Sequence, residues 1–233
     1  MKVLITGGTR GIGLAAAERF YEAGYDVAVL GRNFQNISHR SFRKVPFDLS
    51  NISAIPQLFQ TLGEIDILVN NAGIDTKSDF LDYSEEQIER ILNINLRAPL
   101  ELMNAAIRGF RERGRGGRIV NVASQAGEVG HTDVWYGMTK AALINATKSY
   151  VSIVGKEGIV INAVAPGPVG TEMIRNSIYN SRFESVRRRT YTERFAEPEE
   201  IAEVIFWLAT ASPVYLNGEV INLNNGAQRI KSE

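Results

Sequence analysis

The hydrophobic residues of this chain fall into short, nearly unbroken runs, separated by longer segments of mixed polarity. Such runs are typical of strands that are buried on both faces, as in a parallel sheet. The runs are VLI at 3–5, VAVL at 27–30, ILV at 67–69, IVNVA at 119–123, IVINAVA at 159–165 and VINL at 220–223. A shorter strand-like segment, KVPF, occupies 44–47.

The segments between these runs carry apolar residues at helical spacing, most clearly at 13–24, 84–95, 136–155 and 198–210. Strand and helix therefore alternate along the chain. With right-handed crossovers, this alternation predicts an α/β fold, a doubly wound parallel sheet of about seven strands (a Rossmann fold) with helices on both faces. Ligands of such sheets bind beyond the carboxyl ends of the strands, so the chemistry is expected in the loops that leave those ends.

Length and composition predict one domain over 1–233, because no linker, repeat or low-complexity tract divides the chain. The one compositional shift is a polar, Arg-containing stretch at 171–197, which we interpret as a lid over the substrate. Acidic and basic residues balance at 26 each, which removes the general electrostatic argument for a nucleic acid or an anionic membrane as partner. No apolar run reaches about 18 residues and no leader is evident, so we expect a cytoplasmic protein.

Cysteine is absent from the sequence, which excludes disulfides, a thiolate nucleophile and cysteine-based zinc sites. The two histidines, His39 and His131, make a poor set of metal ligands, and we predict no metal site. The chemistry must use other residues.

The first strand leads into TGGTRGIG, residues 6–13. Glycines at 7, 11 and 13 allow a tight turn and a close approach to a pyrophosphate, whose charge the amides of the following helix would meet. The alternative is a tight connection without a ligand. The position between strand and helix favours a dinucleotide.

The end of the second strand decides the form of the dinucleotide. An acid there would bind a ribose 2′-hydroxyl, but the sequence has Gly31-Arg32-Asn33. Arg32, together with Arg10 in the glycine loop, offers charge-assisted bonds to a 2′-phosphate, which favours NADP over NAD. Two solvated surface arginines are the alternative.

Tyr136 and Lys140 are the candidates for the reactive group. Four residues apart on a helix, they lie on one face, and we expect the ammonium to lower the phenol's pKa from its usual value near 10. Ser124, at the carboxyl end of the fifth strand, could orient the substrate oxygen as Tyr136 exchanges a proton. Its alternative is a local turn hydrogen bond.

Asn95 precedes Pro99 by four residues, and proline has no N–H to donate to the carbonyl of Asn95. That carbonyl is therefore free for water. The alternative is that Asn95 caps a helix beginning near Leu96, with Pro99 in its first turn.

Taken together, TGxxxGxG, NNAG at 70–73, Asn95, Ser124, Tyr136, Lys140, the PG of 166–167 and YLNGEVINLNNG resemble the short-chain dehydrogenase/reductase family in order and spacing. The resemblance implies an oxidoreductase that moves a hydride between a nicotinamide and a carbonyl or alcohol. It implies four catalytic residues, Asn95, Ser124, Tyr136 and Lys140, with a water on Asn95 relaying protons from Lys140. The residues implied to bind the cofactor are Gly7, Thr9, Arg10, Gly11, Ile12, Gly13, Arg32, Asp48, Leu49, Asn71, Ala72, Gly73, Tyr136, Lys140, Pro166, Gly167, Val169 and Thr171.

Within that set, Asp48 is implied to lie beside the adenine, and Thr171 to bond the nicotinamide carboxamide. A helix cap before Ser50 is the alternative for Asp48. Three departures from the family pattern are evident. Only 15 residues separate Arg32 from Asp48, so the helix between the second and third strands is expected to be absent. NNG at 224–226 replaces DGG, and the 12-residue interval from Ser124 to Tyr136 is one residue shorter than in the carrier-protein reductases.

Among family members the chain most resembles the 3-oxoacyl-acyl-carrier-protein reductases of fatty acid biosynthesis, in which two arginines dock the acidic carrier. Arg115 and Arg175 fall at matching offsets, and Arg187–Arg189 adds a basic patch to the expected lid. Reduction of sugars, polyols or other small carbonyls is the alternative, and a non-catalytic NADP-binding sensor is the alternative of a different class. By the same analogy, helices at 96–112 and 134–155 predict a homotetramer or a dimer.

Overall fold

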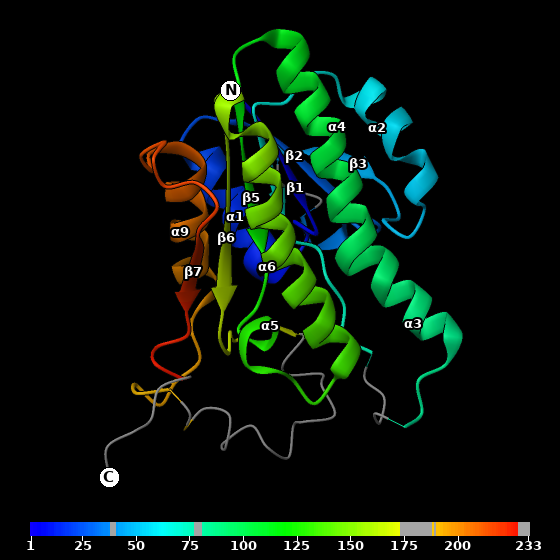
Figure 1. Ribbon diagram of the computed structural model, residues 1–233, viewed down its shortest axis with the longest axis vertical. Coiled ribbons are helices and arrows are strands. Elements are labelled where there is room, and N and C mark those ends of the chain that lie inside the picture. The colour runs from blue at the N-terminus through cyan, green and yellow to red at the C-terminus, as the bar shows by residue number, and fades with distance from the viewer. Residues whose placement is uncertain (38–40, 77–80, 173–187, 189, 228–233) are drawn as a thin grey trace.

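The computed structural model describes residues 1–37, 41–76, 81–172, 188 and 190–227 (Figure 1). Its centre is one sheet of seven parallel strands, which confirms the predicted number and direction. The strands are β1 (Lys2–Thr6), β2 (Asp26–Gly31), β3 (Arg43–Pro46), β4 (Ile67–Asn70), β5 (Gly117–Val122), β6 (Ile159–Pro166) and β7 (Val220–Leu223).

The strand order is β3-β2-β1-β4-β5-β6-β7. The chain therefore winds outward in one direction from β1 to β3 and in the other from β4 to β7. Loops leaving β1 and β4 diverge at this reversal, which opens a crevice at the carboxyl edge of the sheet. The doubly wound topology expected from the alternation of strands and helices is confirmed.

Helices cover both faces of the sheet (Figure 1). Helices α1 and α9 pack against each other and against one face, around a core that includes Phe20 and Ile205. Helices α2, α4 and α6 cover the other face, around Leu102 and Phe110. The helices are α1 (Gly11–Glu22), α2 (Ile55–Leu62), α3 (Glu85–Leu92), α4 (Ala98–Arg113), α5 (Ala126–Val129), α6 (Val134–Val154) and α9 (Pro198–Thr210).

Helices α3 and α4 are joined by a single π-helical turn, Asn93–Arg97. The amide of Ala98 donates to the carbonyl of Asn93, five residues back, and Pro99 follows with no amide to donate. The helix therefore continues through Asn95, and the alternative that Asn95 caps a helix starting near Leu96 is wrong. Alpha helices tolerate such a turn as an insertion, and it redirects the side chains that it carries.

Between β2 and β3 the described residues contain only the 3₁₀ turn Gln35–Ile37, which agrees with the predicted loss of a helix there. Two further 3₁₀ turns, Ile52–Ala54 and Gly155–Glu157, precede α2 and β6. Within the described ranges no helix is long and apolar enough to cross a membrane. The expected lid at 171–197 lies mostly outside the described residues, as do His39, Arg175, Arg187 and Arg189.

Candidate active site

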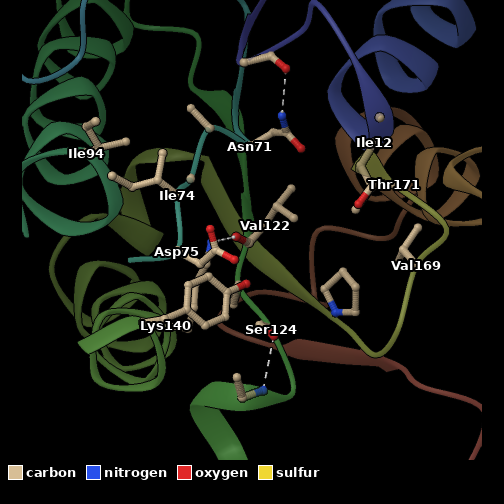
Figure 2. Close-up of a pocket in the computed structure, with 18 of the residues that line it drawn as sticks. Ile12, Asn71, Ile74, Asp75, Ile94, Val122, Ser124, Lys140, Val169 and Thr171 are labelled. Carbon is tan, nitrogen blue, oxygen red and sulfur yellow. Dashed lines mark hydrogen bonds between the residues drawn. The ribbon is translucent and has the colours of Figure 1, made fainter. Parts of the chain in front are cut away.

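A cavity of about 810 Å³ opens at the carboxyl edge of the sheet, at the reversal of strand order. Figure 2 shows side chains from the strand ends and from α6 converging on it. Of the twenty residues implied by the family resemblance, eighteen line this cavity: Gly7, Thr9, Arg10, Gly11, Ile12, Arg32, Asp48, Leu49, Asn71, Ala72, Gly73, Ser124, Tyr136, Lys140, Pro166, Gly167, Val169 and Thr171. Gly13 and Asn95 are the two that do not line the cavity.

The glycine loop forms one wall of the cavity. Its glycines have no side chains, so their backbone borders the cavity directly. Gly7 and Gly11 have φ of 65° and 52°, in the left-handed region that glycine tolerates. A Cβ on Gly13 would lie 2.4 Å from the carbonyl oxygen of Gly7, so only glycine lets α1 approach β1 this closely. The first amides of α1 receive no hydrogen bond from a capping side chain, and the first two residues of the helix, Gly11 and Ile12, line the cavity. This cradle fits a pyrophosphate.

The loop after β4 is held to β1 by amide side chains. Asn71 Nδ2 donates to the carbonyls of Thr6 and Gly7 at 2.9 and 3.2 Å, and Thr6 Oγ1 accepts from the amides of Asn71 and Ala72. One strand inward, Asn70 Nδ2 donates to Asn121 Oδ1 at 2.9 Å. The asparagines therefore bridge neighbouring strand ends.

Arg32 and Asp48 also line the cavity, at the points where β2 and β3 end. Asp48 Oδ1 accepts from the amide and hydroxyl of Ser50 at 2.9 and 2.8 Å, and the amide bond lowers the pKa of Asp48 against the effect of burial, with the Arg32 charge adding to it. Asp48 thus both lines the cavity and makes a local turn bond. Arg10 pairs with Glu172 at 3.0 Å on the surface.

The candidate catalytic groups meet where β5 and α6 approach. Ser124 follows β5, and its Oγ accepts from the amide of Ala126 at 3.1 Å, the local turn bond of the alternative reading. Ser124 also lies near the Tyr136 phenol and lowers its pKa. The local turn bond of Ser124 is therefore present, and its role in orienting the substrate oxygen stays a prediction. Lys140 is buried, and its Nζ donates to the carbonyl of Val122 at 2.8 Å (Figure 2).

The prediction that Lys140 lowers the pKa of Tyr136 is wrong for the chain alone. Tyr136 is partly buried on the cavity wall, and the protein atoms packed around its phenol raise its pKa to about 12, against the effect of Ser124 and with further upward effects from Asp75 and Asp133. Lys140 Nζ lies 5.7 Å from the Tyr136 ring centre, and burial lowers its own pKa to about 8. Near neutral pH the phenol therefore holds its proton.

Asn95 is fully buried in the π-helical turn and does not line the cavity. Its side chain binds the backbone of Ile74 in both directions, accepting from the amide at 2.9 Å and donating to the carbonyl at 2.8 Å. Asn95 Nδ2 also lies 3.3 Å from Thr139 Oγ1, which donates to the carbonyl of Tyr136. Asn95 therefore connects the loop after β4 to the catalytic helix.

Arg115 does not lie at the cavity. It precedes β5, at the amino edge of the sheet, and pairs with Asp66 and Glu64 at 3.4 and 3.7 Å. The carboxyl and amino edges are separated by the length of the strands, so Arg115 cannot contact a substrate in the cavity of its own chain. Its predicted role beside Arg175 is therefore not supported within one chain.

Several polar residues that sequence reasoning did not assign to the site also line the cavity, among them Asp75, Gln125 and Asp133. Gln125 Oε1 is buried without a hydrogen-bond partner among the described residues, which is typical of a group that meets a ligand. Asp133 is the N-cap of α6, and an acidic residue directly before a helical segment was an available signal. Among the described residues no cluster could hold a metal ion.

A family model described as enoyl-(acyl carrier protein) reductase matches residues 7–228. The chain is 33% identical to the 3-oxoacyl-[acyl-carrier-protein] reductase of Aquifex aeolicus, over 96% of this chain and 95% of that protein. A solved 4-hydroxyisoleucine dehydrogenase with NADH and succinate superposes with a TM-score of 0.93 at 28% identity, over the whole of both chains.

A second solved structure, from Agrobacterium tumefaciens and assigned as a 2-deoxy-D-gluconate 3-dehydrogenase with bound NADP, gives a TM-score of 0.89 at 28% identity. It covers 97% of this chain and 96% of that one. The relatives thus share the fold and the reaction type but differ in substrate and in nicotinamide cofactor. The chain belongs to the short-chain dehydrogenase/reductase family, oxidoreductases that act on CH–OH groups with a nicotinamide cofactor.

Proposed function

We propose that the protein is an NADPH-dependent ketone reductase in which Tyr136 is the general acid. The observation that carries this proposal is that Ser124, Tyr136 and Lys140 line the cavity together, with Lys140 Nζ 5.7 Å from the centre of the Tyr136 ring. A phenol with a pKa of about 12 can donate a proton to a developing alkoxide but is a poor base at neutral pH. The site therefore favours reduction over oxidation.

Each of the four proposed catalytic residues has its own task. Bound NADPH supplies the hydride. Tyr136 donates the proton to the carbonyl oxygen, and Ser124 orients that oxygen by a hydrogen bond. The Lys140 ammonium, held by the carbonyl of Val122, favours the phenolate that this proton transfer leaves behind. Asn95 fixes the loop at Ile74, and we propose that the water relaying protons to Lys140 binds its backbone carbonyl.

NADPH is proposed over NADH because of the end of β2. Gly31 and Arg32 line the cavity there, and the charge of Arg32 acts on Asp48 nearby. Its guanidinium is exposed and available to a 2′-phosphate. Arg10 is the second candidate for this contact and would have to leave Glu172 to make it.

For the substrate we propose a 3-oxoacyl thioester, which the 3-oxoacyl-[acyl-carrier-protein] reductase among the relatives supports. An acyl carrier protein is then the proposed partner, and fatty acid biosynthesis the proposed setting. A sugar or polyol is the second candidate, favoured by the carboxylate of Asp75 beside Tyr136, since carboxylates accept hydrogen bonds from hydroxyl groups. By analogy with the family, we also propose that the protein is cytoplasmic and forms a homotetramer.

The test is NADPH consumption with acetoacetyl thioesters and with a panel of ketoses and small ketones, repeated with NADH. We expect turnover of at least one ketone and a higher kcat/KM with NADPH than with NADH. Tight NADPH binding without turnover of any compound would favour a non-catalytic sensor. A preference for ketoses over thioesters would favour the second candidate.

A further inference from the structure

Asp133 is a buried acid at the cavity that accepts four hydrogen bonds. Its side chain is 3% exposed and sits at the N-cap of α6, three residues before Tyr136. Oδ1 accepts from the amide of Tyr136 and from the hydroxyl of Tyr83, both at 3.0 Å. Oδ2 accepts from the amide and the hydroxyl of Thr76, both at 2.8 Å. One buried carboxylate thus joins three segments of the chain.

These hydrogen bonds keep Asp133 ionised. Burial alone would raise the pKa of this carboxyl, but the bonds from the amides of Thr76 and Tyr136 outweigh burial and lower it. A helix N-cap needs only one acceptor, and serine or asparagine would serve as well. Capping therefore explains the bond to Tyr136 and leaves the two bonds to Thr76 without a reason.

Thr76 lies in the loop that leaves β4, and residues 71–75 of this loop form a wall of the cavity. Two side chains fasten the loop to the catalytic helix. Asn95 binds Ile74 and reaches Thr139 of α6, one turn beyond Tyr136. Asp133 binds Thr76 from the first turn of the same helix. The cavity wall and the helix that carries the proposed acid are therefore fixed to each other at two points.

We propose that Asp133 is a positioning residue for the reaction, which sets the place of the Tyr136 hydroxyl relative to the loop 71–76 by binding Thr76 and the first turn of α6. The inference rests on the proposed function of Tyr136. Holding a reacting group in place matters because misplacement by about 1 Å can cost about 100-fold in rate.

The charge of Asp133 also acts on Tyr136. The ionisable groups that face the phenol are Asp75 from the loop after β4, His131 and Asp133 from the segment before α6, and Lys140 from α6 itself. Asp75 and Asp133 both raise the pKa of Tyr136, after the larger effect of burial. Removing the charge at position 133 should therefore make the phenol ionise at lower pH.

The test compares Asp133→Asn and Asp133→Ser with the wild type. Both replacements keep a cap for α6, but the asparagine NH₂ would face the Thr76 amide and serine is too short to reach it. We expect kcat for ketone reduction to fall about tenfold or more, with KM for NADPH changing less than about twofold. Loss of the Lys140 proton, whose pKa is about 8, gives one step of the alkaline limb, and the later step, at which Tyr136 ionises and can no longer donate a proton, should move to lower pH in both variants.

Ser84→Ala is the matched control. Ser84 caps α3 by accepting from the amide of Gln87 at 3.2 Å, and it does not line the cavity. Its loss should lower thermal stability while leaving kcat and the pH profile unchanged. If Asp133→Asn and Asp133→Ser are folded and match the wild type in kcat and in the alkaline limb, Asp133 is only a helix cap and the inference is overturned.

Two further measurements keep the inference testable. Tyr83→Phe keeps the carboxylate and removes one of its four donors, so kcat should fall two- to fivefold with no shift of the alkaline limb, whether or not the Asp133 variants fold. Hydrogen exchange at the Thr76 amide does not depend on turnover: it should be faster in Asp133→Asn, and unchanged exchange would contradict the inference. Failure of the wild type to reduce any ketone would instead overturn the proposed function.

Discussion

The two edges of the sheet use polar side chains in opposite ways. At the amino edge, Asp66 accepts from the amide of Lys2 at 2.8 Å and pairs with Arg113 at 2.9 Å and Arg115 at 3.4 Å. At the carboxyl edge Gln125 Oε1 is buried without a partner among the described residues, and Arg32 is exposed at the cavity. At the amino edge charged groups pair with one another, although Arg113 Nε and Nη2 stay buried without a partner among the described residues, whereas the carboxyl edge carries the cavity.

This difference separates stability from function in a way that can be measured. Groups that satisfy one another inside the chain contribute to the free energy of unfolding, and their loss leaves a buried partner without a bond. Groups that face a cavity contribute to binding and catalysis, and their loss lowers ligand affinity or kcat. Substitutions at the amino edge should therefore lower stability without changing kcat, and those at the carboxyl edge should do the reverse.

The largest expected effect is that of Tyr136→Phe at the carboxyl edge. The substitution removes the proposed proton donor, and loss of a general acid costs about 100- to 10,000-fold in rate. We expect kcat for ketone reduction to fall by about 1,000-fold in steady-state assays. Because phenylalanine retains the ring, the melting temperature and the affinity for NADPH should change little. Retention of wild-type kcat would show that Tyr136 is not the acid.

The positions of the candidate residues at this edge were predictable, because the strand pattern alone determines which loops meet there. The runs at 3–5, 67–69 and 119–123 become β1, β4 and β5, and the parallel direction brings their carboxyl ends to one edge. Ser124 and Asn71 follow two of those strands directly and therefore line or border the cavity.

Features that depend on packing in three dimensions were not predictable in the same way. The sign of the shift in the pKa of Tyr136 depends on how many protein atoms surround the phenol, which the spacing to Lys140 does not contain. The place of Arg115 was missed because an offset from Ser124 runs back along β5 to the opposite edge. The π-helical turn at Asn95 could not be predicted, because Pro99 is compatible both with the start of a helix and with a π-helical insertion inside one.

A smaller effect, on stability alone, is expected for Asp66→Asn at the amino edge. Asparagine cannot accept from both the Lys2 amide and the Arg113 guanidinium with an oxygen, so one buried donor loses its partner. We expect a loss of about 2 kcal/mol in the free energy of unfolding, measured by urea denaturation, with kcat/KM unchanged. A matched fall in kcat would contradict the separation of the two edges.

The control at this edge is Glu64→Gln. Glu64 is 70% exposed and lies 3.7 Å from Arg115 and 3.9 Å from Arg113, so its loss should cost less than about 0.5 kcal/mol. The pH dependence sharpens the test. Burial would raise the pKa of Asp66, but the bonds from Lys2 and Arg113 lower it. Its stabilisation is therefore present above the unfolded pKa of about 4 and lost in acid, where wild type and Asp66→Asn should converge.

The smallest effect is expected for Arg32→Ala, and it concerns the cofactor alone. Because Arg32 is exposed, water and salt screen its proposed bond to a 2′-phosphate, and a contribution of about 1.4 kcal/mol corresponds to a tenfold change in affinity. We expect KM for NADPH to rise about tenfold at low salt and less at high salt, with KM for NADH unchanged. Arg111→Ala is the control, because Arg111 is also exposed but pairs with Glu157 away from the cavity. An equal rise of KM for both cofactors would show that Arg32 does not distinguish them, and the 2′-phosphate contact would then have to come from Arg10 after it leaves Glu172.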